Sequence, residues 1–80
     1  MSEQPRIPDP LLRKTAQRTA AAHTAASRDL EDFLRHVPST PTAADIAEYA
    51  NLIARERALR IDRDAAINAL GLDASTVEPD

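Results

Sequence analysis

The sequence predicts an all-α protein: a long antiparallel helical hairpin plus a short third helix, completed by dimerisation or by another partner. Three observations lead to this prediction. One stripe of residues follows helical spacing for almost thirty positions, a proline-containing break comes after it, and the 80 residues include a single glycine. Scarce glycine disfavours the tight turns of β-hairpins and glycine-rich phosphate loops.

The first helix is predicted over residues 9–37. Asp9 can cap it, Pro10 suits its first turn, and Pro38 cannot continue it. Gaps alternating between four and three residues keep one stripe on a single helix face. That stripe comprises Leu12, Ala16, Thr19, His23, Ala26, Leu30, Phe33 and Val37.

The second helix follows the short break at residues 37–42 and is predicted to run to about residue 60. Thr42 and Asp45 have the spacing of a capping box in which Asp replaces Glu. The predicted apolar face comprises Ala43, Ile46, Ala47, Ala50, Ile53, Ala54 and Ile61. Folding this helix back on the first places Leu34 opposite Ile46 and Leu30 opposite Ala50.

The third helix is predicted after a second break at residues 61–64. Asp62 or Asp64 can cap it, and it ends near Leu70. Gly71 then has the place of a left-handed C-terminal residue, with Leu72 making the accompanying apolar contact.

The length allows one domain with a thin core. We expect a flexible N-terminal arm at 1–8, a single helical domain at 9–72 and an acidic tail at 73–80. A chain this short buries only about 60% of its unfolded surface. Alanine fills little volume, and Phe33 and Tyr49 are the only aromatic residues. Such a core often needs a second copy or a partner.

Composition narrows the classes of function. The formal net charge is −3, about +1 over residues 1–37 and −4 over residues 38–80, which argues against a domain whose whole surface binds nucleic acid. There is no cysteine, no visible signal peptide and no apolar run long enough to cross a bilayer. We therefore expect a cytoplasmic protein without a membrane partner.

Two leucines on the outer face of the second helix are the candidate partner-binding residues. Leu52 and Leu59 lie within an acidic frame of Asp45, Glu48 and Glu56. An exposed apolar pair in such a frame is typical of a docking surface for a partner helix or a second subunit. The alternative is that the third helix folds back and covers both leucines.

His23 and Arg57 are a candidate polar core layer. Both lie within apolar stripes, and the hairpin pairing places them opposite each other. They can form a layer that fixes the register of the helices, or a site for an anion. In the alternative, Arg57 extends its charge to solvent and His23 sits at the edge of the core.

A basic side of the first helix is the candidate phosphate contact. Arg13, Lys14 and Arg18 lie opposite the apolar stripe. They can contact nucleic-acid phosphates, although no aromatic residues lie among them to stack on bases. The alternative is an ordinary solvated face.

The sequence predicts no catalytic, cofactor-binding or metal site. It lacks a thiol nucleophile, a triad partner for either histidine, and the ligand spacing of zinc or calcium sites. We expect a small non-enzymatic protein–protein interaction module, such as a regulator, adaptor or inhibitor, whose partner is another protein or a second copy. The alternative is a nucleic-acid-associated regulator or antitoxin-like protein that uses the basic side.

Overall fold

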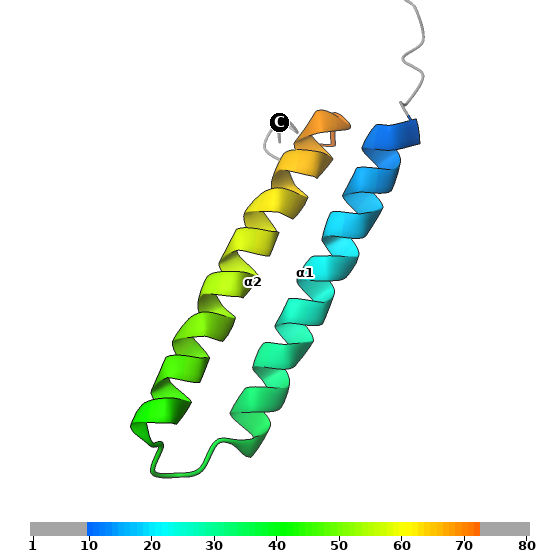
Figure 1. Cartoon of the computed structure of the whole chain (residues 1–80). Helices are drawn as coiled ribbons and strands as arrows, with labels where there is room; N and C mark the ends of the chain where they lie inside the picture. Colours follow the sequence, from blue (N-terminus) through cyan, green and yellow to red (C-terminus); the bar gives the residue numbers. More distant parts are fainter. Residues whose placement is uncertain (1–9, 73–80) are drawn as a thin grey trace, which may run out of the picture.

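The computed structural model describes residues 10–72, which form two helices packed side by side. Helix α1 spans Pro10–His36 and helix α2 spans Ala43–Ala69, with 27 residues each. They run antiparallel, so the first and last described residues lie at the same end of the hairpin (Figure 1). Residues 10–72 contain no strand, and the predicted all-α hairpin is confirmed. The predicted arm at 1–8, the cap at Asp9 and the tail at 73–80 lie outside the described residues.

The ends of the helices follow the predicted capping signals. Pro10 begins α1, and α1 stops at His36, two residues before Pro38. At the start of α2 the Asp45 backbone N–H donates to the Thr42 hydroxyl over 3.1 Å, and the Thr42 N–H donates to the Asp45 carboxylate over 2.9 Å. The capping box is therefore confirmed.

The end of α2 is a Schellman motif. Gly71 has φ 84°, the left-handed conformation that glycine adopts without steric cost. Its N–H donates to the Asn68 carbonyl over 2.9 Å, and the Leu72 N–H donates to the Ile67 carbonyl over 3.2 Å. The predicted role of Gly71 is confirmed.

The predicted third helix is wrong, because α2 continues without a break through residues 61–64. Asp62 and Asp64 are good caps, but inside a helix an aspartate costs only about 0.7 kcal/mol relative to alanine. A break would also leave several backbone groups without their helical hydrogen bonds. Packing of α2 along the whole of α1 outweighs the local signal.

The predicted face of α2 is also wrong, although the level of pairing is right. Ile46 and Ile61 were expected in the core and are 62% and 67% exposed. His23 was expected opposite Arg57 and instead contacts Glu56, the adjacent residue. One residue corresponds to about 100° around a helix, so α2 is turned by roughly that angle from the expected orientation.

Two matched rows of residues form the seam between the helices. The α1 row is the predicted stripe, in which every residue but Leu12 is buried or half-buried. The α2 row has the same alternating spacing of four and three. It comprises Asp45, Tyr49, Leu52, Glu56, Leu59, Arg63, Ala66 and Leu70. This repeat of seven is the pattern of antiparallel helices packed at a shallow angle.

Within residues 10–72 the buried residues are all alanines. Ala16, Ala26 and Ala66 are 8%, 1% and 9% exposed. Small side chains let the helix backbones approach closely, but they contribute little burial. The larger apolar side chains of the seam are only half-covered, so the hairpin resembles one half of a four-helix bundle.

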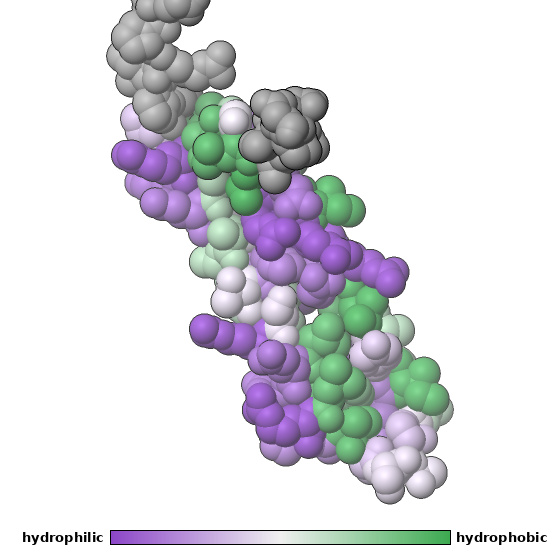
Figure 2. Space-filling model, turned by 180° about the vertical axis from the view of Figure 1, so that it is seen from behind, coloured by the Kyte–Doolittle hydropathy of each residue, from purple (hydrophilic) through white to green (hydrophobic). Residues whose placement is uncertain are grey.

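Apolar side chains reach the surface unevenly. Seen from behind, a large hydrophobic patch covers part of the half nearest the loop and a smaller one lies at the other end, with a strongly hydrophilic stretch between them (Figure 2). Neither α1 nor α2 is long and apolar enough to cross a membrane.

Candidate functional site

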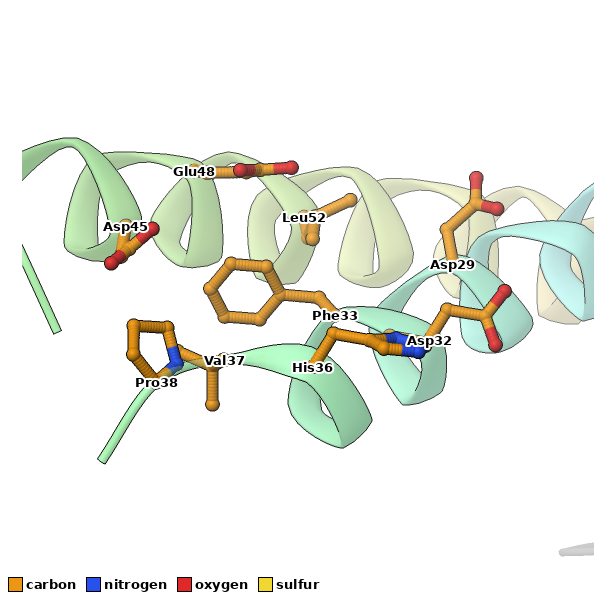
Figure 3. A pocket seen from close by; sticks show the side chains of 9 residues that line it. All are labelled: Asp29, Asp32, Phe33, His36, Val37, Pro38, Asp45, Glu48 and Leu52. Atoms are coloured by element: carbon orange, nitrogen blue, oxygen red, sulfur yellow. The ribbon is translucent and has the colours of Figure 1, made fainter. Parts of the chain in front are cut away.

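An acid-rimmed pocket lies on one side of the seam, at the loop end of the hairpin (Figure 3). Its volume is about 540 Å³. The apolar part is formed by Phe33, Val37, Pro38 and Leu52. The polar part is formed by Asp29, Asp32, His36, Asp45 and Glu48.

The loop and the aromatic residues shape this pocket. Pro38 turns the chain away from α1, and the capping box at Thr42 starts α2 close by. The Phe33 ring lies between the two helices and beneath Leu52 (Figure 3). Its centroid is 5.9 Å from that of Tyr49, with an angle of 31° between the planes, which is a favourable aromatic contact.

The rim carboxylates differ in their partners. Asp29 pairs with Arg55 at 3.3 Å and Asp32 with Arg35 at 2.8 Å, both between side chains more than half exposed. Asp45 accepts the capping hydrogen bond. For Glu48 the structure records no ion pair within residues 10–72, so its charge is available to a partner.

His36 adds a directed polar group. Its Nδ1 lies 2.9 Å from the Asp32 carbonyl oxygen, and a carbonyl can only accept, so Nδ1 is the donor. In the neutral ring Nε2 is then an acceptor. The pocket therefore combines an apolar floor with acceptors at its edge, an arrangement that suits an apolar side chain flanked by cations.

The predicted partner-binding residues are brought together only in part. Leu52, Asp45 and Glu48 line the pocket. Leu59 is half-buried at a seam position and not on an outer face, because α2 is turned toward α1. Glu56 also faces the seam and contacts His23.

The sequence interpretation missed the α1 side of the pocket. Phe33, His36, Asp29 and Asp32 line it together with the α2 residues. The signal was the spacing of four and three on α2, which aligns Tyr49, Leu52 and Glu56 with the α1 stripe. Following that spacing would have placed Leu52 beside Phe33.

A polar layer crosses the seam near its middle, but its members differ from the predicted pair. His23 Nε2 lies 2.8 Å from the Glu56 carboxylate, and Arg63 Nη1 lies 3.3 Å from His23 Nδ1. Arginine can only donate, so Nδ1 accepts and Nε2 carries the proton that is donated to Glu56. Arg57 is exposed and not hydrogen-bonded to His23, so the predicted His23–Arg57 layer is wrong.

The polar layer changes the pKa of Glu56. The hydrogen bond from His23 lowers the pKa of Glu56 below its ordinary value of 4.5. Partial burial opposes this effect, and the positive charges of Arg60 and Arg57 reinforce it. A carboxyl whose pKa is lower in the folded state stabilises the fold above its unfolded pKa, and that contribution is lost as the pH falls through the folded value.

Glu56→Gln is expected to reduce the acid sensitivity of the hairpin. Wild-type melting temperature should fall below about pH 4.5 partly because Glu56 becomes protonated. The glutamine variant lacks this ionisation and should show a shallower decline in thermal melts followed by circular dichroism. Glu48→Gln, at a position that pairs with no basic group in the described part, should keep the wild-type slope. Equal slopes for wild type and Glu56→Gln would contradict the assignment.

Arg63→Met and Arg57→Met are expected to differ in how much they lower the free energy of unfolding. Arg63→Met removes the donor to His23, and we expect it to lower the free energy of unfolding by about 1 kcal/mol. Arg57→Met changes an exposed side chain and should cost less than about 0.5 kcal/mol. Denaturant unfolding at one protein concentration measures both. A larger loss for Arg57→Met would restore the pairing expected from sequence.

The predicted phosphate-contact residues stand apart from both sites. Arg13, Lys14 and Arg18 are exposed on α1. The described part of the chain holds no ion pair for any of the three. It also has no cluster of three or more side chains of the kinds that could hold a metal ion.

The geometry defines an antiparallel helical hairpin with an acid-rimmed pocket at its loop end. Comparison with known proteins adds no relative: no family model, no curated protein and no solved structure matches this chain.

Proposed function

We propose that this chain is a small non-enzymatic protein-interaction module, in the manner of a regulator, adaptor or inhibitor, acting in the cytoplasm. The observation that carries the proposal is the acid-rimmed pocket. Leu52 and Phe33 form an apolar floor between the helices, and Glu48 at its edge has no ion pair among the described residues.

The fitting partner is a protein segment with a bulky apolar side chain and neighbouring Arg or Lys residues. The apolar side chain would insert against Phe33 and Leu52. The cations would meet Glu48 and the outer oxygens of Asp29 and Asp32. Complementary charge of this kind increases specificity and the association rate, while burial of the apolar group provides most of the affinity.

A titration with a defined peptide tests this function. The probe is a fluorescently labelled amphipathic helical peptide with leucines and arginines at i, i+4 spacing, and the readout is anisotropy. Glu48→Lys should weaken binding about ten-fold. The matched control is Glu31→Lys, which makes the same charge change at an exposed position outside the pocket. No binding at millimolar peptide, or an equal loss in both variants, would contradict the proposal.

A second candidate function rests on the basic side of α1. The exposure of Arg13, Lys14 and Arg18, without ion pairs among the described residues, favours contact with nucleic-acid phosphates. In this case affinity for duplex DNA should fall steeply with added salt and with Arg13→Ala/Lys14→Ala/Arg18→Ala. Absence of binding at low salt would rule this function out.

A further inference from the structure

The two sides of the seam differ in chemistry. On each helix, residues spaced by seven share a side, next to the seam. The polar flank is the side of the acid-rimmed pocket. It comprises Thr15, Ala22, Asp29, His36, Glu48, Arg55, Asp62 and Ala69. The apolar flank is the opposite side. It comprises Arg13, Ala20, Ser27, Leu34, Ile46, Ile53, Arg60 and Ile67.

The structure supports this division directly. Asp29 of α1 pairs with Arg55 of α2, which places both on the polar flank. Leu34 and Ile46 line a second groove of about 220 Å³ on the opposite side. Phe33, Val37, Pro41, Asp45 and Tyr49 complete that groove.

Large apolar side chains on the apolar flank face solvent. Leu34 is 53% exposed, Ile46 is 62% exposed and Tyr49, at the groove, is 40% exposed. They lie in the loop half of the hairpin, where apolar side chains gather at the surface (Figure 2). The groove is continuous with the seam, because Phe33 and Tyr49 belong to both. An occupant of the groove would therefore extend the existing thin core.

We propose that a second copy of this chain covers the apolar flank and that the two hairpins form a four-helix bundle. The two-fold axis would run along the hairpin, so α1 packs on α2 of the partner subunit. The proposal concerns the side opposite the acid-rimmed pocket and does not depend on the proposed function.

The register of the hairpin fixes which residues would face each other across the interface. A level is a position along the hairpin at which one residue of α1 lies beside one residue of α2. His23 contacts Glu56 and Phe33 contacts Tyr49, so residue numbers rise along α1 while they fall along α2 from level to level. The two-fold keeps each level, so a small residue faces a larger one at two of the four levels, and Leu34 meets Ile46 in an apolar contact at the loop end. The facing pairs are Leu34 with Ile46, Ser27 with Ile53, Ala20 with Arg60, and Arg13 with Ile67 of the partner subunit.

The charged residues of this flank are Arg13 and Arg60, both outside the apolar groove. In the two-fold arrangement Arg60 faces an alanine and Arg13 faces an isoleucine, so no like charges oppose each other at these levels. On the polar flank the same levels would place Asp29 against Arg55 and Glu48 against His36 of the partner subunit, so the exposed apolar side chains of Leu34 and Ile46, and not charge, single out the apolar flank. The bundle leaves both acid-rimmed pockets on its outer surface.

Mass in solution tests the assembly. Light scattering over a range of concentrations should give twice the 8.7 kDa of one chain. Ile46→Asp should raise the dimer dissociation constant about 100-fold, because each copy loses an apolar contact and gains a buried charge. Ile61→Asp is the matched control, because Ile61 is equally exposed but lies on neither flank. Its mass should remain that of the dimer, and circular dichroism should show both variants helical.

Disulfide trapping tests the orientation of the two copies. The chain has no cysteine, so single substitutions introduce unique thiols. Oxidising a mixture of Ser27→Cys and Ile53→Cys chains should give a covalent dimer, whereas each variant alone should give little. The proposal would be overturned by a monomeric wild type or by a dimer that survives Ile46→Asp. Trapping of each variant alone to the same extent as the mixture would overturn the orientation.

Discussion

Replacing Ala26 with leucine is expected to lower the melting temperature by about 10–20 °C. Ala26 is 1% exposed and lies in the seam between the two helices. A larger side chain there forces the backbones apart, and such overpacking costs about 2–3 kcal/mol. In a domain of this size each kcal/mol corresponds to roughly 4–8 °C. The measurement is thermal unfolding followed by circular dichroism at one protein concentration.

Ala25→Leu is the matched control for this prediction. Ala25 is the preceding residue of α1 and is exposed, so the same substitution should change stability by less than about 0.5 kcal/mol. If Ala26→Leu were as stable as the control, the close approach of the helices at Ala26 would be refuted.

Replacing Phe33 with alanine is expected to cost about 2–3 kcal/mol and to abolish binding of the cationic peptide. The ring is half-buried, so the loss should fall below the 3–5 kcal/mol typical of a fully buried phenylalanine. The substitution removes the contact with Tyr49 and part of the floor of the acid-rimmed pocket. Chemical denaturation and the anisotropy titration measure the two effects.

Phe33→Leu separates the aromatic contact from simple burial. Leucine keeps most of the apolar volume and loses the contact with Tyr49, for which we expect about 1 kcal/mol. Peptide binding should be weakened but measurable. A stability loss below 1 kcal/mol for Phe33→Ala would mean that the ring contributes little to the seam.

The sequence predicted the hairpin because its local signals agree with its tertiary structure. The α1 stripe, the break at Pro38, the capping box at Thr42 and the turn at Gly71 all appear in the structure. Each of these signals lies within one helix or at one of its ends, so it does not depend on how the two helices pack. Counting residues from the loop was then sufficient to find the level at which the helices pair.

The orientation of α2 could not be found from hydrophobicity alone. Ile46, Ile53 and Ile61 make a more apolar stripe than the true seam, which contains Glu56 and Arg63. Those two polar residues fit the seam because His23 lies across from them and bonds with both. A charged side chain at a seam position is stabilising only when a group on the other helix replaces the hydrogen bonds that it loses to water.

The same rotation explains how the candidate site was partly predicted. Leu52, Asp45 and Glu48 were identified from α2 alone, as an apolar residue in an acidic frame. The α1 residues of the pocket could be identified only after Leu52 was placed beside Phe33. Leu59 was assigned to the same surface by its spacing from Leu52, but the seam half-buries it.

Together the two proposals assign the two flanks different tasks. The apolar flank would join two copies, and the polar flank would present one acid-rimmed pocket on each side of the bundle. Two pockets in one assembly would increase avidity for a partner that carries two basic segments. Loss of the dimer would then weaken binding of such a partner without changing the affinity of a single pocket.

The most direct test of the central claim is a map of backbone amide shifts during titration with the cationic amphipathic peptide. Amides of Phe33, His36, Glu48 and Leu52 should shift most, because they surround the acid-rimmed pocket. Those of Arg13, Lys14 and Arg18, on the basic side of α1, should stay in place. Shifts centred on Leu34, Ile46 and Ile53, or none at saturating peptide, would contradict the assignment of partner binding to the acid-rimmed pocket.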